Sequence, residues 1–114
     1  MARKNVLESA IEGYLEDQCR LRDVFVMKNT GRNGIPDRLL IYHGIHWFVE
    51  VKRPGEKPSE LQSAVARKLI RHGSIAICVD TKPGVDELLE ALTSHRDAPR
   101  SMVRLMTGTT QTTR

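Results

Sequence analysis

The chain has 114 residues, 39% of them hydrophobic and 28% charged, with a formal net charge of +4 at pH 7. This length is sufficient for one domain with its own core, and no stretch reaches the roughly 18 uninterrupted apolar residues of a membrane span. The basic N-terminal segment is not followed by the apolar run of a secretory signal peptide, and the cysteines and histidines show no zinc-ligand spacing. We therefore expect a cytoplasmic protein without a membrane partner, and the moderate basic excess is compatible with binding to nucleic acid.

The first part of the chain predicts a helix, a short strand and a loop. Apolar residues recur at helical spacing from Asn5 to about Arg20, which predicts a helix with one stripe facing a core. Residues 24–28 form a short run of β-favouring residues. Residues 29–36 contain turn-forming residues and a proline, so they predict a loop.

Residues 37–43 and 46–52 are candidate strands, and the short gap at Gly44 and Ile45 predicts a hairpin between them. Side chains alternate between the two faces of a strand. On the second strand, one face is therefore expected to carry Trp47, Val49 and Val51, and the other Phe48, Glu50 and Lys52.

The second half of the chain predicts further helices and strands. Residues 59–72 have helical periodicity, the apolar run at 74–80 predicts a strand covered on both faces, and residues 85–95 predict another helix. Residues 101–106 are expected to form an edge strand, and the threonine-rich residues 107–114 predict a loose tail.

The predicted order of elements is α-β-β-β-α-β-α. The strand-helix-strand passage around residues 46–80 implies a right-handed crossover and a parallel pair of strands within a mixed sheet. The expected fold class is α/β, a small mixed sheet with flanking helices. We place one domain at residues 1–100 and a C-terminal strand or loose tail at residues 101–114.

Three charged residues cluster in the predicted hairpin. Asp37 opens the first strand, and Glu50 and Lys52 lie at the matching end of the second, so their side chains can meet. Carboxylate oxygens favour Mg²⁺ or Mn²⁺ over zinc. Such a site can polarise a phosphodiester and activate water, while a lysine offsets negative charge in the transition state. The alternative is that Asp37 or Glu50 forms an ordinary ion pair with Lys52 or Arg38 in the sheet.

The order Asp, a gap, then Glu-x-Lys resembles the signature of the PD-(D/E)xK nuclease superfamily, with Pro36-Asp37 as PD and residues 50–52 as ExK. The flanking segments GIPDRLLI, FVEVKRPGEKPSELQ and GSIAICVD are similar to the VRR-NUC branch, the virus-type replication-repair nuclease domain. The resemblance extends from about Glu8 to Asp80. It implies the restriction-endonuclease-like αβββαβ core of that family.

The resemblance implies two further site residues, each with a structural alternative. Glu8 on the first helix matches a metal-binding glutamate, with Glu12 one turn later as the fallback. Glu8 is also spaced to be the third residue of a capping box that begins at Asn5. Gln62 on the second helix matches a glutamine beside the catalytic lysine, but Ser59 and Gln62 also fit a capping box.

By the same resemblance, Asp37 and Glu50 are the central metal ligands, the backbone carbonyl of Val51 is a further ligand, and Lys52 is the catalytic lysine. Basic residues beside the motif are candidate phosphate contacts, although each is equally a candidate solvated surface charge. These residues are Arg32, Arg38, Arg53 and Lys57.

The implied function is Mg²⁺- or Mn²⁺-dependent endonucleolytic hydrolysis of DNA. The chain resembles short stand-alone members of this branch that phages encode, which implies a homodimer in the host cytoplasm that nicks branched DNA such as four-way (Holliday) junctions. The alternatives are a nuclease for flaps or single strands, a duplex-nicking nuclease, and a non-catalytic DNA-binding module with a nuclease fold. No predicted helix has the character of a base-reading recognition helix, so we expect recognition of DNA structure rather than sequence.

Overall fold

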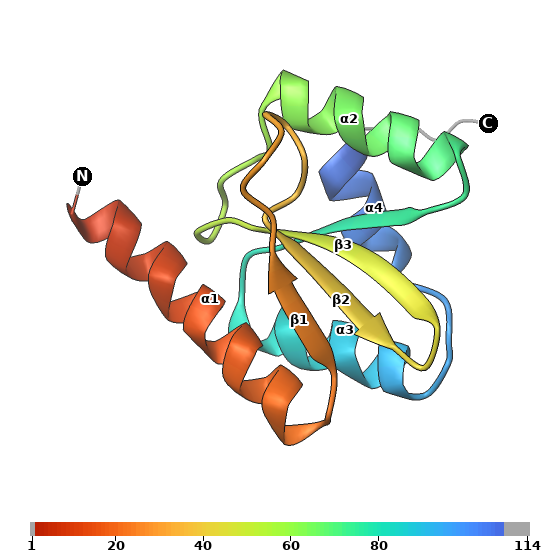
Figure 1. Ribbon diagram of the computed structural model, residues 1–114. Coiled ribbons are helices and arrows are strands. Elements are labelled where there is room, and N and C mark those ends of the chain that lie inside the picture. The colour runs from red at the N-terminus through yellow and green to blue at the C-terminus, as the bar shows by residue number, and fades with distance from the viewer. Residues whose placement is uncertain (1, 109–114) are drawn as a thin grey trace.

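The computed structural model describes residues 2–108, with side chains from Leu7 onward. Within these residues a mixed sheet lies between two helical layers (Figure 1). The strands are β1 (Phe25–Lys28), β2 (Arg38–Tyr42), β3 (Ile45–Val51) and β4 (Ile75–Val79). The helices are α1 (Ala2–Leu21), α2 (Glu60–Arg71), α3 (Lys82–Thr93) and α4 (Arg100–Thr107).

The four strands follow the order β1-β2-β3-β4 across the sheet. Strands β1, β2 and β3 are antiparallel neighbours, and β4 pairs with β3 in parallel after the crossover through α2. This topology confirms the predicted α/β class with its mixed sheet and flanking helices.

The two faces of the sheet are covered by different helices. Helices α1 and α3 cover one face, where the larger core includes Leu15 of α1, Leu88 of α3 and Val49 of β3. Helices α2 and α4 pack over the other face near β4, where Ala66 and Met106 meet the sheet. The alternation predicted for β3 is confirmed, because its first face packs in the larger core.

The second face is open over β1 and β2. The strand register pairs Phe25 with Ile41, Met27 with Leu39, and Leu39 with Phe48, and directly paired residues share a face. Phe48 packs on the side of α2 and α4, so all five residues lie on that side. Phe25 is 60% exposed and Met27 41% exposed. We call these five residues the open sheet face.

The hairpin turn lies one residue earlier than predicted. Tyr42 pairs with Ile45, so the two turn residues are His43 and Gly44, whose φ angles are 46° and 85°. Two consecutive positive φ angles are typical of a type I′ turn, which matches the twist of a hairpin. The correction leaves the predicted faces of β3 unchanged.

The expected edge strand at residues 101–106 is wrong, because this segment belongs to α4. Met102 and Met106 are buried one helical turn apart, and the helix ends at Gly108, whose φ is 73°. Because α4 packs on β4 and α2, the fold continues past the predicted boundary at residue 100. Residues 109–114 of the predicted tail lie outside the described residues.

Helix α3 begins three residues before its predicted start, because the Thr81 side chain caps it by accepting a hydrogen bond from the Gly84 N–H at 3.0 Å. Among residues 2–108, no helix combines the length and the apolar character that crossing a membrane requires.

Candidate active site

Asp37 and Glu50 meet where β2 begins and β3 ends. Arg38 pairs with Val49 across the two strands, which brings the preceding Asp37 opposite Glu50. The Asp37 backbone N–H donates to Glu50 Oε1 at 3.2 Å. The loop before Asp37 is closed by Asn29, whose Nδ2 donates to the Pro36 carbonyl at 3.1 Å. The peptide bond that precedes Asp37 is therefore held at both its carbonyl and its N–H.

Glu50 is a buried carboxylate with several protein partners. Its side chain is only 3% exposed. Gln62 Nε2 donates to Glu50 Oε2 at 3.1 Å, and Lys52 Nζ lies 3.8 Å from the same oxygen. Burial, followed by the negative charge of Asp37, raises the pKa of Glu50 to about 7, whereas Lys52 and the Asp37 N–H act in the opposite direction. Lys52 is thus the cation that directly faces the buried carboxylate.

Gln62 takes part in the capping box and also contacts Glu50. Its Oε1 accepts a hydrogen bond from the Ser59 N–H at 2.8 Å, and Ser59 Oγ accepts one from the Gln62 N–H at 3.1 Å. These two bonds confirm the capping box at the start of α2. The other end of the same amide donates to Glu50, so the cap orients Gln62 toward the site.

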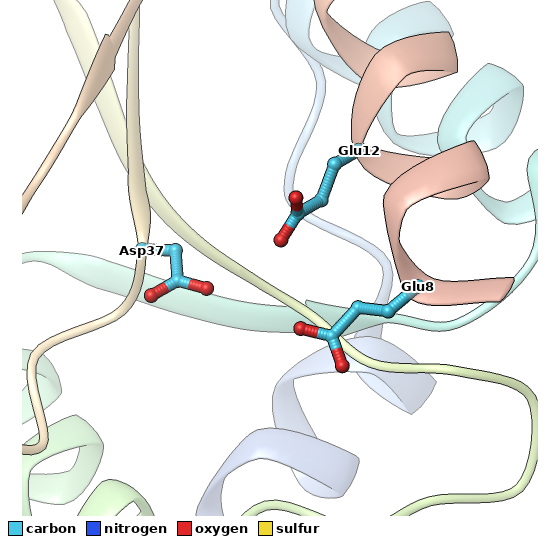
Figure 2. Close-up of side chains that lie close together, drawn as sticks. All are labelled: Glu8, Glu12 and Asp37. Atoms are coloured by element: carbon cyan, nitrogen blue, oxygen red, sulfur yellow. The ribbon is translucent and has the colours of Figure 1, made fainter. Parts of the chain in front are cut away.

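Helix α1 adds two carboxylates to the site. Glu8, Glu12 and Asp37 each have a carboxylate oxygen within 4.8 Å of the others, and the three side chains converge from α1 and from the start of β2 (Figure 2). The alternative role of Glu8 in a capping box at Asn5 is wrong, because α1 begins at Ala2. Glu12 lies beside Glu8 in this cluster, so the predicted fallback is an additional candidate ligand.

The cluster has the chemistry of a divalent-cation site. Burial, then the neighbouring charge of Glu12, raises the pKa of Glu8, with further contributions from Glu56 and Asp37 and an opposing one from Lys52. A carboxylate whose pKa is raised by neighbouring negative charge is stabilised when the group shares a cation, and an all-oxygen donor set suits a hard ion such as Mg²⁺ or Mn²⁺. The residues present therefore fit such an ion.

The segment after β3 is held against the end of β4. The Lys52 backbone N–H donates to the Val79 carbonyl at 3.0 Å, and the Gly55 N–H donates to Asp80 Oδ2 at 3.0 Å. Val51, the residue before Lys52, is buried within β3. Asp80 was not singled out from the sequence, and its position directly after a buried strand is the signal that could have identified it.

The four predicted phosphate contacts differ in their surroundings. Arg32 and Lys57 are exposed, and Arg53 is partly exposed, with its Nε 3.7 Å from Glu56 Oε1. The expectation of a surface contact fails for Arg38, because its side chain is buried and its Nε donates to Glu16 Oε2 at 2.9 Å. Arg38 lies on the face of β2 that packs against α1, so its side chain points toward α1 instead of solvent.

The chain is similar to known proteins in both sequence and fold. Over 80 residues the chain is 35% identical to a protein of Acyrthosiphon pisum secondary endosymbiont phage 1 named "Putative nuclease p44", an alignment that covers 68% of this chain and 86% of that protein. A solved structure described as "VRR_NUC domain" matches with a TM-score of 0.68 and 31% sequence identity, covering 73% of this chain and 94% of that one. No family model matches the sequence.

Proposed function

The chain belongs to the VRR-NUC family of nuclease domains, and on that premise we propose that it is a Mg²⁺- or Mn²⁺-dependent endodeoxyribonuclease that nicks branched DNA. The observation that carries the proposal is the convergence of Glu8, Glu12 and Asp37 within 4.8 Å, beside a buried glutamate that faces a lysine at 3.8 Å. Carboxylates around a cation, with a lysine alongside, suit the hydrolysis of a phosphodiester.

Each residue of the site has a defined part in the proposed reaction. The carboxylates of Glu8, Glu12, Asp37 and Glu50, with the Val51 carbonyl, would hold the cation, which when bound polarises the phosphate and favours deprotonation of water. Gln62 and the Asp37 N–H keep Glu50 oriented. The Lys52 ammonium orients the attacking water and offsets the charge that develops on the phosphate.

In the proposed hydrolysis, the water oxygen forms a bond to phosphorus as the bond to the 3′-oxygen breaks. The leaving oxygen takes up a proton and becomes a 3′-hydroxyl, and the other product has a 5′-phosphate. Arg32, Arg53 and Lys57 are the proposed contacts to neighbouring phosphates, because their side chains are at least partly exposed.

A symmetric homodimer would place two such sites on the two sides of a branched substrate. The open sheet face supports a second copy of this chain as its partner. Its five residues are all apolar, and two of them, Phe25 and Met27, are strongly exposed. Homodimer interfaces are enriched in such apolar, aromatic and methionine side chains and depleted of charge. Apolar sheet faces can pack against their own copy about a two-fold axis.

The nuclease proposal is tested by incubating the protein with end-labelled four-way junction, flap, duplex and single-stranded DNA in Mg²⁺, Mn²⁺ or EDTA. Glu50→Ala is the inactive control, and circular dichroism verifies that it folds. We expect metal-dependent nicks in symmetric arms of the junction that the variant does not make. Preference for flaps or single strands would contradict the proposed branched substrate but would still support the proposed hydrolysis. Binding of the junction without cleavage would favour a non-catalytic DNA-binding module.

The dimer is tested by light scattering during size-exclusion chromatography. We expect the unaltered protein to elute as a dimer and Phe25→Asp as a monomer. Leu21→Asp is the matched control, because Leu21 is also an exposed large apolar residue but lies at the end of α1, outside the open sheet face. A monomeric unaltered protein, or a Phe25→Asp variant that remains dimeric, would overturn the proposed interface.

A further inference from the structure

Arg38 joins β2 to two glutamates of α1. Its side chain is 4% exposed, its Nε donates to Glu16 Oε2 at 2.9 Å, and its Nη2 lies 3.7 Å from Glu12 Oε1. Glu12 and Glu16 are four residues apart, so they are neighbours on one side of the helix. The guanidinium therefore spans two carboxylates, one of which belongs to the acidic cluster with Glu8 and Asp37.

Helix α1 has anchors other than this arginine. On the same stretch of helix, Ile11 and Leu15 are buried in the larger core. The Tyr14 hydroxyl also donates to Asp86 Oδ1 of α3 at 2.7 Å. A buried guanidinium is costly to desolvate and is not in itself a stabilising feature. Within the described residues, moreover, Arg38 Nη1 is buried without a hydrogen-bond partner.

We propose that Arg38 is a positioning residue for the candidate metal centre, holding the Glu12 carboxylate in place beside Glu8 and Asp37. This inference rests on the proposed function, because it assumes that the acidic cluster binds a divalent cation. Arg38 directly follows Asp37 in the chain, so one short segment of β2 supplies a carboxylate to the cluster and restrains a second.

The chemistry of the side chain explains why an arginine occupies this position. A guanidinium is a rigid planar fork with several donors and can engage Glu12 and Glu16 together. A lysine ammonium at the same place keeps the positive charge, but it is a compact group on a flexible chain. It can therefore restrain one of the two carboxylates but not both together. Arg38→Lys therefore removes the restraint on the Glu12 carboxylate while it leaves the net charge unchanged.

The test is calorimetric titration of Mn²⁺ into the DNA-free protein, comparing the unaltered chain, Arg38→Lys, Glu12→Gln and the double variant. Outer-shell partners of metal ligands typically contribute about 10-fold to 100-fold in affinity. We expect each single substitution to weaken Mn²⁺ binding at least about 10-fold. The double variant should bind no more weakly than Glu12→Gln alone, because Arg38 acts through Glu12. Arg22→Lys is the matched control, since Arg22 contacts Gln18 and not the cluster.

Additive losses in the double variant, or an unchanged affinity in Arg38→Lys or in Glu12→Gln, would overturn the positioning role. Absence of Mn²⁺ binding by the unaltered protein would overturn the proposed metal centre itself, and the inference with it. If Arg38→Lys does not fold, Glu16→Gln takes its place. That variant loosens the same fork while keeping Arg38 and Glu12, and it should weaken binding only when Glu12 is present.

Discussion

The carboxylates of the candidate site are held in two different ways. At the β3 end, Glu50 is buried and contacts the Asp37 N–H, Gln62 and Lys52. At the α1 end, Glu8 and Glu12 are only partly buried and face each other across a helical turn. Glu12 Oε1 lies 3.7 Å from Nη2 of Arg38.

This difference separates a buried part of the site from a partly exposed one. The β3 end is built from residues close in sequence, since Glu50, Lys52 and Gln62 belong to one strand-loop-helix segment. The α1 end depends on how a distant helix packs on the sheet. We infer that Glu50 is pre-organised for catalysis, and that the α1 carboxylates set how tightly a cation is held.

A large loss of cleavage is expected from altering the α1 end. The double variant Glu8→Gln/Glu12→Gln keeps side-chain size and one acceptor oxygen at each position but removes two negative charges from the cluster. We expect cleavage to fall at least about 100-fold, the upper end of what an outer-shell partner contributes, with little loss of melting temperature. Cleavage assays and thermal melts of the same samples check this. Cleavage at the unaltered rate would exclude α1 from the site.

Next comes the pH dependence of stability at the β3 end. The folded-state pKa of Glu50, about 7, lies above the roughly 4.3 of an unfolded glutamate. The contribution of protonated Glu50 to the free energy of unfolding is therefore fully present below about pH 4.3, and it is lost as the pH rises to about 7. In EDTA, Glu50→Gln avoids this loss. The unfolding free energy of the variant minus that of the unaltered protein should therefore rise by up to about 3 kcal/mol from pH 5 to pH 8.

Denaturant unfolding of both proteins at the two pH values measures this gain. Titrations of groups distant from Glu50 affect both proteins equally, so the difference between the two curves reports Glu50 together with the neighbouring carboxylates coupled to it. An equal difference in unfolding free energy at pH 5 and pH 8 would show that Glu50 is not the buried titrating group.

A smaller effect distinguishes the two contacts of Gln62. Gln62→Ala and Ser59→Ala both break the capping box and should each cost about 1 kcal/mol in unfolding free energy. Gln62→Ala alone removes the donor to Glu50, and it should lower cleavage about 10-fold to 100-fold. Ser59→Ala should leave cleavage unchanged. Equal cleavage rates in the two variants would show that Gln62 serves only as part of the helix cap.

The β3 end was predictable from sequence because strand alternation and a short hairpin suffice to bring Asp37, Glu50 and Lys52 together. The one-residue error in the turn did not matter, since the face of each β3 residue depends on alternation within the strand. Gln62 was also identified, by resemblance, but only the structure shows that its amide serves the cap and Glu50 at once.

Two other features could not be predicted from the sequence: the burial of Arg38 and the helical structure of α4. The burial of Arg38 could not be read from the sequence, because its partners lie on a helix whose rotation relative to β2 is set by core packing. Helix α4 was misread for a different reason. Met102 and Met106 are four residues apart, a spacing that places two side chains on one face of a strand or of a helix alike. Periodicity over so short a segment cannot distinguish the two.

Asp37 joins the two ends of the site, and Asp37→Asn tests the central claim most directly. Asparagine keeps the backbone N–H that donates to Glu50 and nearly the same side-chain volume, while it removes the charge shared with Glu8 and Glu12. The measurement is the rate of Mn²⁺-dependent nicking of a labelled four-way junction by the folded variant. We predict that nicking is abolished while circular dichroism and melting temperature are retained. Nicking at the unaltered rate would contradict a single carboxylate site that spans β2, β3 and α1.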